Sequence, residues 1–194
     1  YGKKEHKMGW NAQPTRMITF DNVEVPVSQR LGEEGQGFAI AMEGLDGGRI
    51  NIATCSVGTA QQALEDAKAY VADRNQFGQA IADFQNTQFK LADMVTELVA
   101  ARQMIRLAAS KLDAGDTQAS TYCAMAKRFA TDVGFKVCND ALQLFGGYGY
   151  IREYPMERYV RDTRVHQILE GTNEVLRGIV GRKLMMDGAL EVIK

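Results

Sequence analysis

The stretch LADMVTELVAARQMIRLAASKLD, residues 91–113, decides the fold class. Its apolar side chains recur at steps of three and four residues, which is the spacing of one face of an α-helix. These side chains are Leu91, Met94, Val95, Leu98, Ala101, Ile105, Ala108 and Leu112. Gly115 follows the run and is a typical residue for a helix end. We therefore predict an amphipathic helix over about residues 85–113.

The rest of the chain beyond residue 36 has the same helical character. Apolar patterns predict long helices over about 38–74 and 117–145, a short helix after Pro155, and a last helix over about 173–187. Three long amphipathic helices and a final one, joined by short links, are typical of an up-and-down four-helix bundle. The sequence therefore predicts a mainly α protein with a helical-bundle domain over residues 36–194.

Residues 1–35 differ from this pattern. Two β-prone pieces, residues 17–20 and 23–26, are separated by the turn signal Asp21-Asn22. They predict one hairpin or a pair of short strands. Because two strands alone are marginally stable in water, they need a further sheet or a helical surface to pack on. We expect a short β segment over residues 1–35.

Charge and composition exclude several classes of function. The chain of 194 residues has 23 Lys and Arg against 24 Asp and Glu, which argues against a nucleic-acid-binding protein. No apolar run is long enough to span a bilayer. Two histidines and three cysteines without metal-like spacing predict no metal site, and we expect the cysteines to be buried, reduced thiols.

The stretch HQILEGTNEVLR places one acid on a short apolar turn before the last helix. Ile168 and Leu169 can shield the carboxylate of Glu170 from water, and Thr172 or Asn173 can cap the helix. A shielded carboxylate is a better proton acceptor than a hydrated one. The alternative is a surface acid beside a helix cap.

Three other segments each allow a structural and a functional interpretation. In DRNQFG, residues 73–78, the Arg74 guanidinium suits a phosphate and the Phe77 ring suits a flat partner, but a polar helix end is equally compatible. In QLFGGYGY, residues 143–150, a helix cap explains one glycine, whereas several glycines permit close approach of a ligand. Asp46 and Arg49 face one side of a helix, where a solvated ion pair is the simplest interpretation.

Taken in order, these motifs resemble the C-terminal half of the acyl-CoA dehydrogenase family, over essentially the whole chain. Residues 1–35 then match the end of the family's middle β domain. Within the family, segments 45–49, 55–58 and 165–171 are similar to the isobutyryl-CoA subfamily. The resemblance implies α,β-dehydrogenation of a short or branched acyl-CoA, with Glu170 removing the α proton and a hydride passing to flavin N5.

The same resemblance implies the residues of the binding sites. Substrate contacts fall on Asp46, Arg49 and Gly171, with Gly48 kept small beside the acyl chain. Contacts to FAD, several of them reaching the cofactor of a neighbouring subunit, fall on Arg74, Gln76, Phe77, Phe84, Gln85, Gln143, Gly146, Gly147, Thr172 and Glu174. Arg161 and Asp162 are expected to form structural ion pairs.

Partners and location also follow from the resemblance. It implies electron transfer to an electron-transfer flavoprotein and a homodimer or homotetramer. It places the protein in the cytoplasm of a bacterium or the mitochondrial matrix of a eukaryote. Because the family's N-terminal helical domain and most of its β domain are absent from the sequence, we expect these 194 residues alone to bind FAD weakly and turn over slowly. The competing hypothesis is a non-catalytic helical assembly module.

Overall fold

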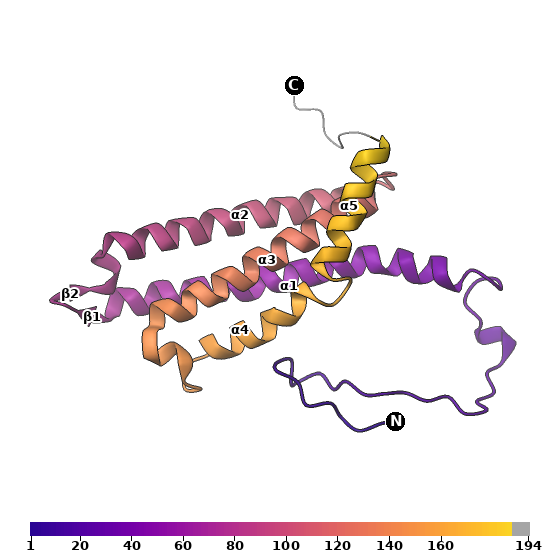
Figure 1. Ribbon diagram of the computed structural model, residues 1–194, viewed down its shortest axis with the longest axis horizontal. Helices are drawn as coiled ribbons and strands as arrows, with labels where there is room; N and C mark the ends of the chain where they lie inside the picture. The colour runs from indigo at the N-terminus through magenta and orange to yellow at the C-terminus, as the bar shows by residue number, and fades with distance from the viewer. Residues whose placement is uncertain (188–194) are drawn as a thin grey trace.

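Three long antiparallel helices form the body of the molecule, and the computed structural model describes residues 1–187 (Figure 1). They are α1 (Gly37–Asp73), α2 (Gln85–Asp113) and α3 (Ala119–Phe145). Their bounds lie within two residues of those predicted, because each apolar stripe ends at a polar or glycine-containing link. Charged side chains line the outer faces, and none of the helices in the described part of the chain could cross a membrane.

Two short helices share the fourth position of the bundle. α4 (Met156–Arg164) packs along α3 and α1, whereas α5 (Asn173–Asp187) packs mainly on α3 (Figure 1). Short 3-10 turns precede them at Gly146–Tyr150 and Val165–Gln167, and two more occur at Val27–Gln29 and Ile81–Asp83. The mainly α bundle is therefore confirmed, with its last quarter divided between two helices.

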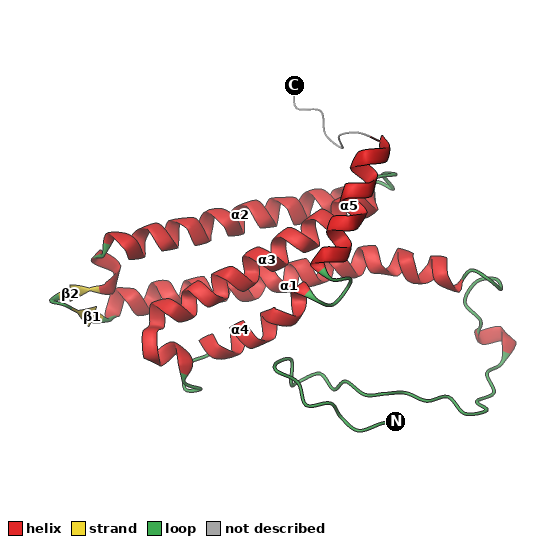
Figure 2. Cartoon of the chain, viewed as in Figure 1, coloured by secondary structure: helices red, strands yellow, loops and turns green. Residues whose placement is uncertain are grey.

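A two-stranded antiparallel ribbon joins α1 to α2 (Figure 2). β1 (Asn75–Gln76) pairs with β2 (Gln79–Ala80), so that Asn75 lies opposite Ala80. The turn between them contains Phe77 and Gly78, which both have positive φ, 54° and 82°. The DRNQFG segment, residues 73–78, therefore forms the end of α1, the first strand of the ribbon and its turn.

Small side chains bring α1 and α3 close together. Ala53, Ala60 and Ala67 of α1 are fully buried, as are Ala126 and Ala130 of α3. At the closest crossing, a Cβ added to Gly134 would lie 2.9 Å from the Ser56 Cβ. Larger buried side chains of α2, such as Leu98 and Met94, fill the space between α2 and the other two helices. Burial of each stabilises the fold by about 1.5–3 kcal/mol.

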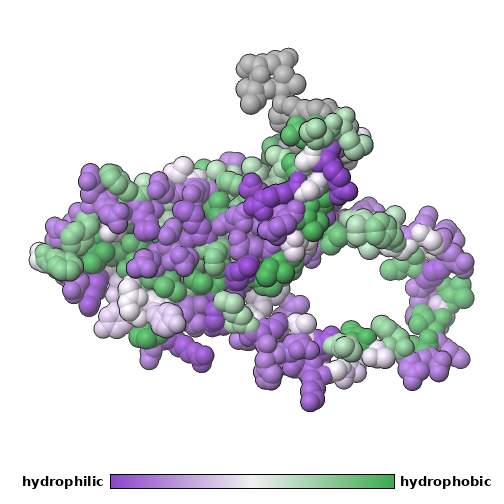
Figure 3. Space-filling model, viewed as in Figure 1, coloured by the Kyte–Doolittle hydropathy of each residue, from purple (hydrophilic) through white to green (hydrophobic). Residues whose placement is uncertain are grey.

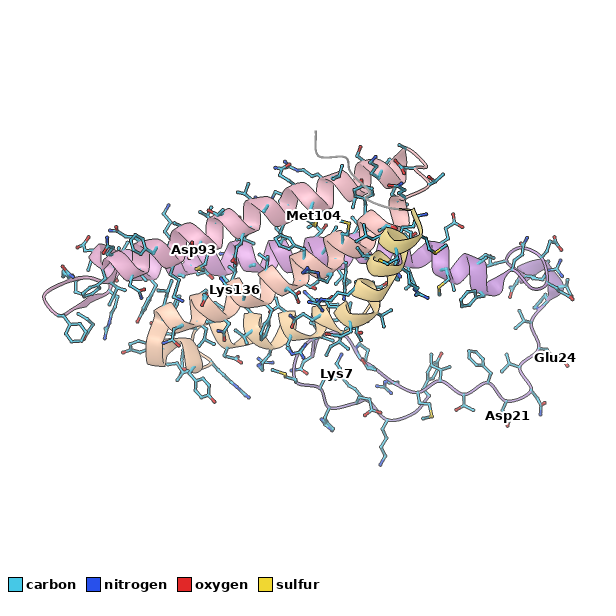
Figure 4. The ribbon with its side chains drawn as sticks, turned by 45° about the horizontal axis from the view of Figure 1, so that its top comes forward. Lys7, Asp21, Glu24, Asp93, Met104 and Lys136 are labelled. Atoms are coloured by element: carbon cyan, nitrogen blue, oxygen red, sulfur yellow. The ribbon has the colours of Figure 1, made fainter. Side chains whose placement is uncertain are left out.

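The N-terminal arm, residues 1–35, contains no strand, so the predicted strand pair over 17–26 is wrong. The arm turns back on itself through two backbone hydrogen bonds, from Gly2 N to Met17 O at 2.8 Å and from Glu5 N to Thr15 O at 2.9 Å. A ladder does not extend because no further strand lies beside it. Asp21 and Glu24 lie where the arm loops away from the helices (Figure 4).

Apolar side chains of this loop remain exposed to solvent. Phe20, Val27 and Leu31 are each more than three-quarters exposed. Figure 3 shows apolar residues on the loop, with an open gap between it and the helices. An exposed apolar stretch of this kind is typical of a surface that another domain or subunit covers.

The beginning of the arm docks on α4. The backbone N–H of Trp10 donates to Asp162 Oδ1 at 2.7 Å, and the Arg161 guanidinium donates to the Met8 carbonyl at 2.9 Å. Arg161 also forms an ion pair with Glu157 of α4. Arg161 and Asp162 therefore fasten the arm to the bundle, in agreement with the structural role predicted for them.

The three cysteines differ in exposure. Cys123 and Cys138 are buried on α3, and burial raises the pKa of these thiols to about 11 and about 12, which makes them inert. Cys55 lies exposed on α1, so the prediction of burial is wrong for it. The helical pattern could not decide this because residue 55 borders the apolar stripe rather than lying in it.

Candidate functional site

Glu170 lies on a tight turn between the Val165–Gln167 3-10 turn and α5. Its backbone has φ of 55°, and the next residue, Gly171, has φ of 92°. A left-handed backbone costs a non-glycine residue about 1–2 kcal/mol. Such a conformation persists only where surrounding contacts hold it, and it is commonest at functional sites. The turn is therefore a candidate site on geometric grounds.

The carboxylate of Glu170 rests on α1 at Gly48. A Cβ added to Gly48 would lie 2.8 Å from the carboxyl carbon of Glu170 and closer still to Oε2. By contrast, a Cβ added to the neighbouring Gly47 would meet no atom within 4 Å. Glycine at position 48 thus gives the carboxylate its place on α1.

Asp46 and Arg49, which flank Gly48 in α1, form an ion pair. The Arg49 guanidinium donates to Asp46 Oδ1 at 2.7 Å, and the Ser120 hydroxyl donates to the same oxygen at 3.0 Å. Arg49 is only 6 % exposed, so the solvated surface pair is excluded as an interpretation. Arg49 Nε is buried and has no hydrogen-bond partner among the described residues. A buried donor without an acceptor indicates a place for a ligand.

Side chains of α3 support the turn from below. The Lys127 ammonium donates to the Gly171 carbonyl at 2.8 Å and to Asn173 Oδ1 at 3.0 Å. Burial lowers the pKa of Lys127 to about 8. Thr172 caps α5 by accepting from the Val175 N–H at 3.4 Å, whereas Asn173 is buried beneath the turn. Of the two candidates, Thr172 rather than Asn173 is therefore the N-cap of α5.

The sequence patterns did not predict the role of Lys127. A signal for it exists, because this lysine lies within the apolar stripe of α3, four residues after Cys123 and four before Thr131. A lysine at such a position must be buried and must find partners.

His166 fastens the other end of the turn to α1. Its Nδ1 and the Ser56 hydroxyl lie 2.6 Å apart, both residues are buried, and the Trp10 ring stands edge-on to the imidazole at 5.3 Å. Burial lowers the pKa of His166 to about 4, against a smaller opposing effect of Asp162, so the ring is neutral at pH 7.

The predicted shielding of Glu170 by Ile168 is not found. Ile168 is half exposed, and together with Leu169 it lines a cavity of about 480 Å³ under the N-terminal arm. The apolar pair faces the arm because the left-handed backbone of the turn directs Glu170 toward α1 instead. Glu174, which begins α5, is largely exposed and forms an ion pair with Arg177 at 3.5 Å.

A larger cavity, of about 1000 Å³, lies at the opposite end of the bundle, near the β1–β2 ribbon. The end of α1, the start of α2 and the end of α3 meet there. They bring together all the motif residues predicted for that region except Gln85, namely Arg74, Gln76, Phe77, Phe84, Gln143, Gly146 and Gly147. Gln85 is exposed on the first turn of α2 and does not line the cavity.

The cavity presents the cations of Arg74 and Lys90 among aromatic and glycine surfaces. The Arg74 guanidinium lies 5.5 Å from the centre of the Tyr148 ring, and Phe77 is 92 % exposed at the rim. Polar side chains that the motifs did not predict, Asn86, Thr87 and Lys90, complete the wall. A forked donor, flat rings and bare backbone suit a dinucleotide.

The two sites lie far apart within one chain. Gly48 and Arg74 are separated by 26 residues of α1 and its end, or about 39 Å at the rise of an α-helix. This distance is longer than an extended dinucleotide. A single bound molecule therefore cannot contact both sites of the same chain.

The comparisons with known proteins agree with this geometry. The acyl-CoA dehydrogenase C-terminal domain matches residues 35–185. The chain belongs to the acyl-CoA dehydrogenase family. It is 57 % identical over 187 residues to the mitochondrial isobutyryl-CoA dehydrogenase of Dictyostelium discoideum, covering 96 % of this chain and 45 % of that protein.

Solved structures of acyl-CoA dehydrogenases and related proteins have the same fold. Butyryl-CoA dehydrogenase from Megasphaera elsdenii matches with a TM-score of 0.92 and 47 % identity, covering 95 % of this chain and 48 % of that one. The structure of PigA with FAD and proline matches with a TM-score of 0.90 and 31 % identity, covering 96 % and 49 %. This chain therefore spans about half the length of the relatives that it matches.

Proposed function

We propose that Glu170 is the base that removes the α proton of a short or branched-chain acyl-CoA, in an FAD-dependent α,β-dehydrogenation. The observation that carries this proposal is the position of its carboxylate, held by a left-handed turn against the bare backbone of Gly48. The similarity to isobutyryl-CoA dehydrogenase supports a branched acyl group as substrate.

The neighbouring charges suit this role. An α C–H is a weak acid, so the developing negative charge must be stabilised by fixed donors in a site without water. Arg49 supplies a buried cation, and Asp46 holds that side chain in place. The backbone of Gly171 follows Glu170 directly, and the Thr172 hydroxyl caps the N-terminus of α5.

The large cavity fits the adenosine-diphosphate part of FAD. Arg74 and Gln76 are donors for the diphosphate, Phe77 and Phe84 offer flat surfaces, and the walls from Gln143 to Gly147 let a ligand approach the backbone. Gln85, Thr172 and Glu174 remain proposed cofactor contacts from other directions. The bound flavin would supply the hydride acceptor for the β carbon.

Because one molecule cannot reach both sites in one chain, we propose that copies of the chain assemble as a homo-oligomer. The cavity of one copy would then serve the flavin whose substrate meets Glu170 of another. An electron-transfer flavoprotein is the proposed acceptor of the electrons, in a mitochondrial matrix or a bacterial cytoplasm.

The visible spectrum of the chain tests the proposal. The purified protein is incubated with FAD, desalted, and treated with isobutyryl-CoA without oxygen. Bleaching of a retained flavin spectrum supports a dehydrogenase half-reaction. A protein that holds FAD stoichiometrically yet is not bleached by any short acyl-CoA contradicts it. A colourless product agrees with weak binding by these 194 residues, and the assay is then repeated on the longest natural form of the protein.

The competing assembly module is favoured by one observation, the exposed apolar loop of the N-terminal arm. Substitution of Glu170 separates the two functions. In an assembly module, Glu170→Gln changes neither the oligomeric state nor any other property, whereas in a dehydrogenase it removes the reaction and leaves assembly intact.

A further inference from the structure

The Glu170 turn is fastened to α3 on both sides by one carboxylate. Asp132 Oδ1 accepts a hydrogen bond from Gln167 Nε2 at 2.8 Å and another from Asn173 Nδ2 at 2.7 Å. Gln167 lies three residues before Glu170, and Asn173 lies three residues after it. A single oxygen therefore sets the distance between the two ends of the turn.

Lys127 provides a second attachment, directly beside the carboxylate-bearing residue. Its ammonium binds the carbonyl of Gly171 at 2.8 Å and Asn173 Oδ1 at 3.0 Å. Lys127 is fully buried, and a buried ammonium is unfavourable unless hydrogen bonds compensate for the lost water. Both bonds point into the turn, so the side chain has its partners there.

The amide of Asn173 joins these two charges. Its oxygen faces the Lys127 ammonium and its nitrogen faces Asp132 and the Thr131 hydroxyl, which lies 3.0 Å away. The Lys127 cation, the Asn173 amide and the Asp132 anion therefore form one hydrogen-bonded series. Each group in the series orients the next. Such a connected buried network restricts its members to one geometry.

The backbone of the turn needs this support. Glu170 and Gly171 both have positive φ, a conformation that a short free loop would leave. Ser56 and His166 hold the start of the turn to α1, but the described residues that bind the stretch after Glu170 are those of α3. We propose that Lys127 and Asp132 are positioning residues that hold the Glu170 carboxylate in its reactive place, a role that rests on Glu170 being the base.

The test uses the FAD-loaded enzyme in its complete natural form with isobutyryl-CoA. Lys127→Met and Asp132→Ala should each lower kcat about 10- to 100-fold, because misplacement of a reacting group by about 1 Å has an effect of that size. The fall in kcat should exceed any rise in KM or loss of FAD, because only Gly171 and Thr172 among the proposed ligand contacts lie on this turn. The isotope effect of deuterium at the substrate α carbon should rise as proton removal becomes slower.

Lys136→Met is the matched control. Lys136 lies on the same helix and binds Glu97 at 3.0 Å and Asp140 at 3.4 Å, away from the turn (Figure 4). This variant removes a lysine of the same helix together with its ion pairs, and it should keep the parent kcat and isotope effect. A stability loss alone, with parent kcat and isotope effect in both test variants, overturns the proposal.

Amide hydrogen exchange gives a readout that does not depend on activity. Residues 168–173 should exchange faster in Asp132→Ala and Lys127→Met than in the parent, while the α1–α3 core keeps its protection. Where Lys127→Met fails to fold, Asp132→Ala carries the test. Unchanged exchange in the turn overturns the proposal.

A parallel Glu170→Gln variant separates this inference from the proposed function. Full activity of the Glu170→Gln variant would show that Glu170 is not the base. The positioning role of Lys127 and Asp132 would then be overturned as well. An inactive Glu170→Gln beside fully active Lys127→Met and Asp132→Ala variants would leave the base in place and overturn only the positioning role.

Discussion

The carboxylate of Glu170 lies against the backbone of Gly48, although the two residues are 122 positions apart in the sequence. The contact joins the turn before α5 to the N-terminal third of α1. It leaves no space for a side chain at position 48, while the neighbouring Gly47 has open space around its Cα. The carboxylate thereby lies on the backbone of α1, one residue before the buried Arg49.

The first prediction concerns this contact. Gly48→Ala should lower kcat at least tenfold, because the new methyl group displaces the carboxylate from its place on α1. Gly47→Ala is the matched control, and it should keep the parent kcat while gaining about 0.5–1 kcal/mol of stability from the better helix propensity of alanine. Steady-state kinetics and urea unfolding measure both. Equal kcat in the two variants would contradict the contact.

The second prediction concerns the base. Glu170→Gln should lower turnover of isobutyryl-CoA by about 10²–10⁴-fold, the usual contribution of general-base catalysis. The amide keeps the size of the side chain, so the helix content and the FAD content should not change. Flavin bleaching under anaerobic conditions is the measurement. Bleaching at the parent rate would eliminate Glu170 as the base.

The third prediction concerns the dependence of stability on pH. The folded pKa of His166, about 4, lies below the ordinary value of 6.5, so the unfolded chain binds more protons between these values. The contribution of neutral His166 to the free energy of unfolding is fully present above pH 6.5. It is lost as the pH falls toward 4, and the loss is about 3 kcal/mol at most.

Urea unfolding at pH 7.5 and pH 4.5 measures this effect. His166→Phe should lose much of the pH-dependent decrease, although it also removes the hydrogen bond to Ser56 and so lowers stability at both pH values. His6→Gln is the control, because His6 is exposed on the arm and its replacement should leave the decrease intact. An unchanged decrease in His166→Phe would contradict the assignment.

The fourth prediction concerns the large cavity. Arg74→Gln should weaken FAD binding about 10- to 100-fold, since a hydrogen bond to a charged group contributes about 1.5–3 kcal/mol. Arg106→Gln on the exposed face of α2 controls for the loss of one positive charge and should bind FAD like the parent. Fluorescence titration with FAD compares them, and equal affinities would exclude Arg74 from the site.

The helices could be predicted from the sequence because their determinants are local. The apolar stripe of residues 91–112 and the glycine after it establish α2, and the ends of α1 and α3 follow in the same way. The prediction of a strand pair over residues 17–26 is wrong because strand formation is not determined locally. A strand depends on partners distant in the sequence, and the backbone hydrogen bond that Met17 of this segment accepts from Gly2 does not extend into a ladder among the described residues.

The sequence by itself determined the helical architecture, the motifs and their order, since these depend on spacing along the chain. Only the tertiary structure decided which motifs meet: the cavity that gathers Arg74 with Gln143, and the packing of Glu170 on Gly48. It also decided the burial of Arg49 and Lys127 and the exposure of Ile168. The physical reason is that burial and hydrogen bonding depend on neighbours in space, which one-dimensional periodicity does not specify.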